Sequence, residues 1–159
     1  MDRGTPRRTQ QRAALSGTPA APIHLDTSFL IRALVPGSAE AAALGVWITE
    51  GRPLAMSAVA WGELLCGPLE ADDEALARAV IRTIVPLDAE AASLAASLFN
   101  AGGRRRGSFP DCLVAATCVR AGAALATANP IDFRRFAGAG PELVHTSDVE
   151  RPGGFPERP

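Results

Sequence analysis

Short apolar segments alternate with longer segments of helical periodicity through most of the chain. PIHLD at residues 22–26 and LAMS at 54–57 have the length and the flanking turn residues of buried strands. Similar apolar runs predict strands at 83–87, 123–127 and 142–146. The alternation predicts an α/β domain with three layers, α/β/α, around a mainly parallel central sheet of four to five strands.

Capping residues locate the helices between these strands. Ser57 is placed to cap a helix over residues 58–66, and Asp88 is placed to cap one that runs to about residue 100. The remaining helices are expected over these ranges: 27–50, as one or two segments broken around Pro36 and Gly37, then 72–82, 109–121 and 130–137.

Both ends of the chain lack this pattern. Residues 1–22 have no apolar period and a net charge of +3, which predicts a disordered N-terminal tail. Residues 150–159 are rich in proline and glycine, which predicts a flexible C-terminal tail. One folded domain is therefore expected over residues 23–149. This segment has a net charge of −4, so a nucleic-acid binder of this kind would need local arginine clusters, metal ions or both.

Composition excludes several classes of protein. No apolar run approaches the ~20 residues that span a bilayer, so we expect no membrane association and a cytoplasmic location. Cys66, Cys112 and Cys118 match neither a paired zinc motif nor a secreted disulfide scaffold, and their apolar settings predict buried, reduced thiols. The chain contains no lysine, which excludes Schiff-base chemistry and a P-loop lysine.

Carboxylates in apolar settings are the candidate functional residues. Asp26 ends the first predicted strand, and sites gather at the carboxyl ends of strands in open α/β sheets. Glu63 is the only charged residue of an otherwise apolar helix, where burial of an unpaired carboxylate is expensive. Asp111 and Asp132 each stand in the first turn of a predicted helix.

Each acid also has a purely structural explanation. Asp26, Asp111 and Asp132 stand where a side chain caps a helix or stabilises its dipole, and Glu63 would reach water past Gly62. Their combination favours function, because a cluster of carboxylates repels itself without cations. Such oxygen ligands suit Mg²⁺ or Mn²⁺, which can lower the pKa of a bound water and stabilise charge on a phosphodiester.

Four motifs, in this order and spacing, resemble the PIN-domain ribonucleases, and most closely the VapC-type toxins of type II (VapBC) toxin–antitoxin pairs. The motifs are LDTSFLI at 25–31, WGELLCG at 61–67, DCLVAATC at 111–118 and ATANPIDF at 126–133. The resemblance covers about residues 23–146. It implies a metal-dependent endoribonuclease that hydrolyses RNA, often tRNA or rRNA, with Mg²⁺ or Mn²⁺ as cofactor. It also implies a homodimer and a cognate VapB-type antitoxin.

The resemblance assigns roles to individual residues. Asp26, Glu63 and Asp111 match the first three acids of the family, which hold the metal and are catalytic. The fourth acidic position is Asp132, with Asn129 as the alternative. Residues expected to hydrogen-bond the acids or a bound water are Thr27, Ser28, Thr127 and Asn129. The long N-terminal segment and the Phe109–Pro110 pair before Asp111 depart from the family pattern.

A run of three arginines precedes the third acid. Arg104, Arg105 and Arg106 stand in a glycine-flanked loop and are expected to hold RNA phosphates near the metal. The structural alternative is a solvated loop on an acidic protein. Arg134 and Arg135 are expected to be an ordinary pair of arginines on a surface helix.

Other functional classes fit the residues less well. A haloacid-dehalogenase-like phosphatase needs a second aspartate two residues after the first, where Ser28 stands, and a receiver domain needs a late lysine. A catalytically silent module that keeps the PIN fold and binds RNA or protein remains the alternative.

Overall fold

The central sheet has five strands, all parallel, in the order β3-β2-β1-β4-β5. The computed structural model describes residues 21–136 and 138–149, so the predicted tails lie almost entirely outside the described residues. The strands are β1 (Ile23–Leu25), β2 (Leu54–Ser57), β3 (Thr83–Val85), β4 (Ala124–Ala126) and β5 (Leu143–Val144). The predicted α/β fold class with a parallel sheet is confirmed.

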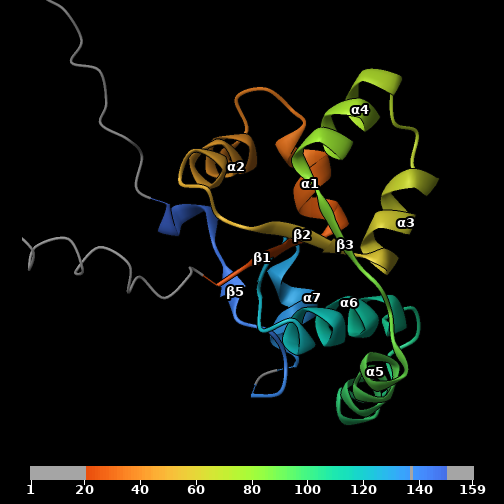
Figure 1. The fold of residues 1–159 in the computed structure, drawn as a ribbon. Helices are drawn as coiled ribbons and strands as arrows, with labels where there is room; N and C mark the ends of the chain where they lie inside the picture. Colours follow the sequence, from red (N-terminus) through yellow and green to blue (C-terminus); the bar gives the residue numbers. More distant parts are fainter. Residues whose placement is uncertain (1–20, 137, 150–159) are drawn as a thin grey trace, which may run out of the picture.

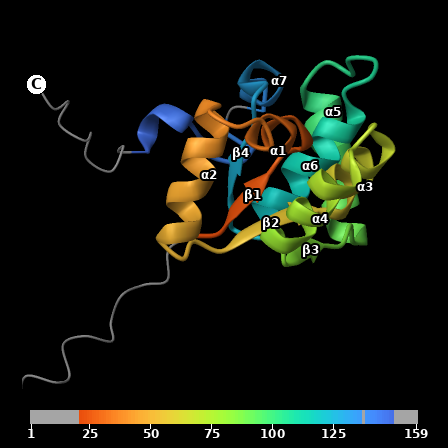
Figure 2. The same ribbon diagram turned by 90° about the horizontal axis from the view of Figure 1, so that it is seen from above.

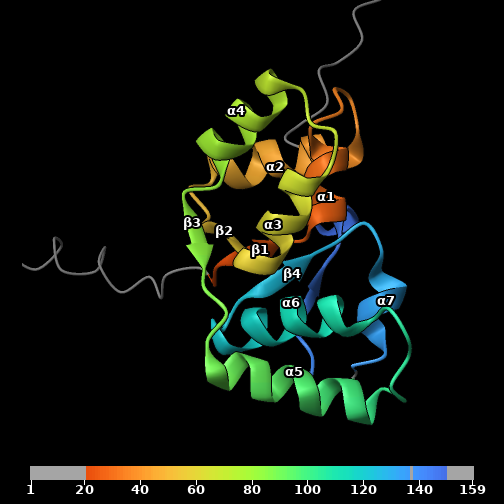
Figure 3. The same ribbon diagram turned by 90° about the vertical axis from the view of Figure 1, so that its right-hand side faces the viewer.

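Helices cover both faces of this sheet. Figures 1 and 3 show α1, α2 and α4 on one side and α5 and α6 on the other. The helix α3 packs against both α1 and α6, so it bridges the two helical layers, and α7 packs against α6. The helices are α1 (Thr27–Ala33), α2 (Ala39–Thr49), α3 (Ala58–Cys66), α4 (Ala71–Val80), α5 (Ala89–Ala101), α6 (Phe109–Arg120) and α7 (Pro130–Arg134), followed by a 3₁₀ turn, η1 (Thr146–Asp148).

Local sequence signals explain most boundaries. The Ser57 hydroxyl accepts the Ala60 amide at 3.1 Å, and the Asp88 carboxylate accepts the Ala91 amide at 2.7 Å, as capping predicts. The strand predicted at 83–87 ends at Val85, because Pro86 has no amide hydrogen for the ladder.

The core lies between the sheet and both helical layers. Phe29 stacks on Trp47 with ring centroids 5.4 Å apart, and both side chains are buried. Cys112 and Cys118 are buried free thiols, as predicted, whereas Cys66 is free but exposed. That prediction was wrong because α3 keeps an apolar face open to solvent: Leu65 is exposed beside Cys66. None of the described helices combines the length and the apolar character that crossing a membrane requires.

The strand order reverses direction between β1 and β4. From β1 the chain builds outward through β2 to β3, and β4 and β5 are then added on the other side of β1. Figure 2 shows β1 and β4 side by side between the helices. Leu25 pairs with Ala126, so Asp26 and Thr127 leave the sheet together at its carboxyl edge. Such a switch point is where open α/β sheets form a crevice for ligands.

Candidate active site

Asp26 stands at the N-cap position of α1 but does not act as a cap. Its side chain makes no capping hydrogen bond. Its Oδ2 atom instead accepts the hydroxyls of Ser28 at 2.6 Å and Thr127 at 2.9 Å. The residue is 9% exposed, so a buried carboxylate is fixed by two neutral donors at the switch point. The capping explanation for Asp26 is therefore wrong.

Backbone amides complete this hydroxyl network. The Ser28 Oγ accepts the Ala128 amide at 3.1 Å, and the Thr127 Oγ1 accepts the Asn129 amide at 3.0 Å. Each hydroxyl has one hydrogen, which it donates to Asp26, and each accepts an amide in return. Asn129 takes part through its backbone, and its side chain makes no cap to α7. The turn after β4 thus sets the orientation of the Asp26 carboxylate.

Glu63 lies on α3, the helix that bridges the two layers, and it is more exposed than its sequence setting predicts. Desolvation of the carboxylate raises the pKa of Glu63, and the negative charges of Asp26 and Asp111 raise it further. The Thr27 Oγ1 lies 3.2 Å from the Glu63 Oε2 and 2.8 Å from the Ala60 carbonyl oxygen, so its one hydrogen is shared between two acceptors.

Asp111 stands in the first turn of α6, a helix that has no side-chain cap at its start. The Ser108 side chain makes no cap and donates to the Arg105 carbonyl oxygen at 2.7 Å. The Asp111 Oδ2 accepts a hydrogen bond from the Arg135 Nη2 at 2.9 Å. Burial raises the pKa of Asp111, and the positive charge of Arg135 lowers it.

The charges of Asp132 and Asp26 add to the upward shift of the Asp111 pKa. Asp132, on α7, lies 3.7 Å from the Arg105 guanidinium, and no side-chain cap forms at the start of its helix. The four acids therefore come from four different segments, yet their charges act on one another. The sequence pattern alone could not establish this proximity.

The donor chemistry of this site fits a hard divalent cation, although the ligand set is not closed. Carboxylate and hydroxyl oxygens are the ligands that Mg²⁺ and Mn²⁺ prefer. A cation there would offset the repulsion that raises the pKa of Glu63 and Asp111. Within residues 21–136 and 138–149, however, no three Asp, Glu, His or Cys side chains are grouped closely enough to hold a metal ion as they stand.

Arg135 is the site residue that the sequence did not single out. Its side chain is only 17% exposed, its guanidinium lies 4.7 Å from the centre of the Phe136 ring, and its Nη2 also lies 3.4 Å from the Ser108 carbonyl oxygen. In sequence it is indistinguishable from its exposed neighbour Arg134. Only the packing of α7 on α6 brings it to Asp111.

The three loop arginines are all exposed. Arg104 adopts a left-handed backbone with φ of 54° and donates to the Asn100 side chain at 2.9 Å. Arg105 reaches Asp132. Of the three, Arg105 therefore brings positive charge next to one of the candidate acids, and the role of the loop in holding phosphates stays a prediction.

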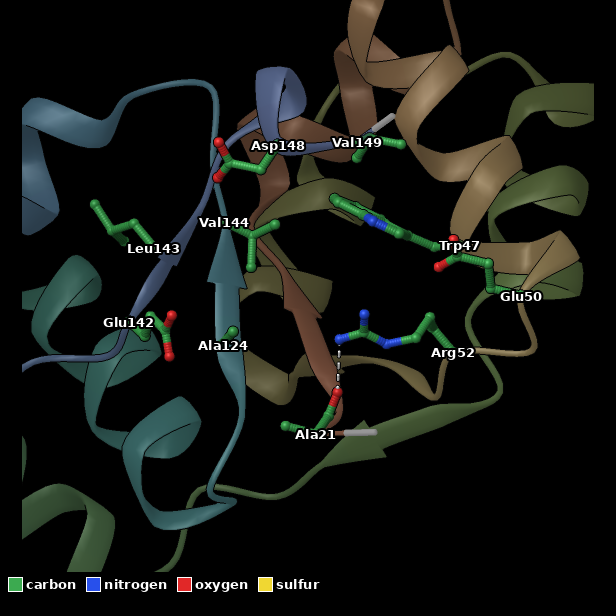
Figure 4. A pocket seen from close by; sticks show the side chains of 10 residues that line it. All are labelled: Ala21, Trp47, Glu50, Arg52, Ala124, Glu142, Leu143, Val144, Asp148 and Val149. Atoms are coloured by element: carbon green, nitrogen blue, oxygen red, sulfur yellow. Dashed lines mark hydrogen bonds between the residues drawn. The ribbon is translucent and has the colours of Figure 1, made fainter. Parts of the chain in front are cut away.

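A cavity of about 470 Å³ lies between α2, the strands β4 and β5, and the segment that follows β5 (Figure 4). Ala21, just before β1, and Ala124, which opens β4, both line it, and the Arg52 Nη2 donates to the Ala21 carbonyl oxygen at 3.1 Å. None of the four candidate acids lines this cavity. It is therefore separate from the acidic site.

The chain is similar to a known protein family and to several solved structures. Residues 23–139 match the PIN domain family. No protein with a curated description matches the chain. Among solved structures, FitAcB from Neisseria gonorrhoeae is similar, with a TM-score of 0.62 and 19% identity, over 80% of this chain and 99% of that chain.

Two VapBC structures are also similar. One is VapBC2 from Rickettsia felis, solved with a DNA fragment from its own promoter. It has a TM-score of 0.60 and 20% identity, over 77% of this chain and 96% of that chain. VapBC-5 from Mycobacterium tuberculosis, a member of the VapBC family of toxin–antitoxin systems, has a TM-score of 0.51 and 26% identity, over 79% of this chain and 100% of that chain.

Proposed function

The chain belongs to the PIN domain family, and we propose on that basis that it is a metal-dependent endoribonuclease and the toxin of a toxin–antitoxin pair. The observation that carries this proposal is the proximity of Asp26, Glu63 and Asp111 near the switch point, where their charges act on one another and no side-chain cap forms at the start of α1 or α6. The charges of Asp26 and Asp111 both act on Glu63. The mutual repulsion of these carboxylates is unfavourable unless a cation offsets it, and perturbed acids of this kind cluster at functional sites.

Asp26, Glu63 and Asp111 are the residues that would hold Mg²⁺ or Mn²⁺, with Asp132, or alternatively Asn129, as the fourth position. The chemistry that such a metal supplies when bound is activation of a water and neutralisation of charge on the phosphodiester. Ser28 and Thr127 hold Asp26 in one orientation through its Oδ2 atom.

The substrate in this proposal is RNA, with tRNA or rRNA as its class. Arg104, Arg105 and Arg106 bind its phosphates, which an otherwise acidic domain needs in order to approach a polyanion. Their loop leads directly into α6, so a phosphate held there lies next to Asp111.

The partner in this proposal is a VapB-type antitoxin that covers the acidic site, and the toxin itself is a homodimer. The likeness to VapBC toxin–antitoxin structures supports the antitoxin partner. Apolar side chains exposed on the described surface, such as Ile31, Val35 and Ile48, offer area for such contacts.

The second candidate is a silent PIN-fold module that binds RNA or protein without turnover. It is favoured by the ion pairs that Asp111 and Asp132 make with arginines and by the open ligand set among the described residues. Cleavage separates the two candidates. The purified chain is incubated with total bacterial RNA in Mg²⁺, Mn²⁺ or EDTA. Discrete products that appear with metal and vanish with EDTA support the nuclease. Intact RNA bound by the protein supports the silent module.

A further inference from the structure

Two ion pairs connect the start of α6 with α7, and each of the two segments supplies one arginine and one aspartate. Arg135, just after α7, reaches Asp111 in the first turn of α6. Arg105, just before α6, reaches Asp132 in α7. Two of the four acids at the site are therefore paired with cations that belong to the chain itself.

The two pairs differ in strength. The Arg105 side chain is 68% exposed and lies 3.7 Å from its partner, so water screens that pair. The Arg135 side chain is 17% exposed and lies 2.9 Å from Asp111. Its Nε and Nη1 atoms are buried and have no hydrogen-bond partner among the described residues. Asp111 is thus the charge that compensates the buried Arg135 guanidinium.

This pairing opposes a cation at the same carboxylate. A dication placed among Asp26, Glu63 and Asp111 competes with the guanidinium for the oxygens of Asp111 and is repelled by its charge. The open ligand set of the described residues is consistent with that competition, because Arg135 holds one of the three acids.

We propose that Arg135 is a built-in counter-ion of Asp111, which a divalent cation must displace, so that metal loading breaks the Arg135–Asp111 pair. This inference rests on the proposed function, because it concerns the same acids. It adds that the affinity of the site for metal is held down by the chain's own arginine. Removing the Arg135 charge therefore tightens metal binding.

The test is a calorimetric titration of the full chain with MnCl₂ alone. Arg135→Met keeps an unbranched apolar side chain beside Phe136 and removes the charge and the donors. Arg134→Met makes the same change at the exposed neighbouring position and is the matched control. Arg135→Gln is the second variant if Arg135→Met does not fold. A second readout is the rise in Tm that Mn²⁺ produces in each protein.

The expected result is Mn²⁺ binding that is roughly tenfold or more tighter in Arg135→Met than in wild type, with Arg134→Met unchanged. The Tm rise at subsaturating Mn²⁺ is correspondingly larger in Arg135→Met. Unchanged or weaker Mn²⁺ binding in both Arg135 variants, with wild-type binding intact, overturns the inference alone and makes Arg135 a support that holds Asp111 in place. Absence of Mn²⁺ binding by all the proteins overturns the proposed function, and the inference with it.

Discussion

Thr127 donates a hydrogen bond of 2.9 Å to the Asp26 carboxylate, although the two residues are 101 positions apart. The bond exists because β1 and β4 are neighbours with Leu25 opposite Ala126, so both strands deliver their next residue to the same point. A residue that could have been a helix cap is instead the centre of a partly buried hydroxyl network. This relationship is the structural basis for treating Asp26 as part of a site.

Replacing Thr127 by valine should weaken metal binding while leaving the fold intact. The change removes the donor to Asp26 and the acceptor of the Asn129 amide but keeps the branched shape. Loss of an outer hydrogen bond to a metal ligand costs about 10–100-fold in affinity. Titration with Mn²⁺ measures it. Thr49→Val, which removes a hydroxyl that bonds only within α2, is the control, and equal loss in both variants would refute the role of Thr127.

Glu63→Gln should stabilise the metal-free protein at pH 7. Burial and the charges of Asp26 and Asp111 raise the pKa of Glu63 above its unfolded value, so stability falls as pH rises through the folded pKa. Removing the charge should raise Tm in EDTA by about 1–3 °C. Excess Mn²⁺ should reverse the order, because only wild type keeps all its ligands. A lower Tm for Glu63→Gln in EDTA contradicts this electrostatic account, and Glu70→Gln serves as the exposed control.

Buried His24 should make the fold sensitive to mild acid. Burial lowers the pKa of His24 from 6.5, and its Nδ1 has no partner among the described residues. The unfolded chain therefore binds a proton first as pH falls, so stability present above pH 6.5 is lost between that value and the lower folded pKa. Denaturant unfolding from pH 7.5 to 5.5 measures the loss. His24→Val should flatten the profile, and His145→Gln, at an exposed position, should not.

Charge reversal of the loop arginines should weaken RNA binding and its salt dependence together. Arg104, Arg105 and Arg106 are exposed, so replacing them by glutamate leaves the core unchanged. The loss of three phosphate contacts to single-stranded RNA should make the slope of log K against log salt shallower by about 2. Binding to catalytically inactive Glu63→Gln protein at several salt concentrations measures the slope. Arg82→Glu, an exposed single reversal on another part of the surface, should change it little.

The sequence predicted the sheet well because strand and helix signals alternate and each has a local cause. Ser57 and Asp88 cap helices where expected, and the predicted strand at 54–57 matches β2. Local reasoning was ambiguous for the acids. Asp111, for example, stands in the first turn of a helix, where an acid can also be present only to stabilise the helix. The structure shows that Asp111 accepts a hydrogen bond from Arg135, a contact that local reasoning did not predict.

What the sequence could not predict depends on the packing of distant elements. The pair between Arg135 and Asp111 spans 24 positions and forms because α7 packs against α6. The exposure of Cys66 depends on which face of α3 the neighbouring helices leave uncovered. The proximity of Glu63 to Asp26 likewise follows from the place of α3 between the two helical layers.

The cleavage rate of the Asp26→Asn variant tests the central claim most directly. Asparagine keeps the size of the side chain and removes the charge that the site supplies at the switch point. We expect metal-dependent RNA cleavage to fall by at least about 100-fold, more than the loss of an outer hydrogen bond produces. Asp72→Asn, at an exposed position on α4, should retain the wild-type rate. Full activity of folded Asp26→Asn would contradict the account.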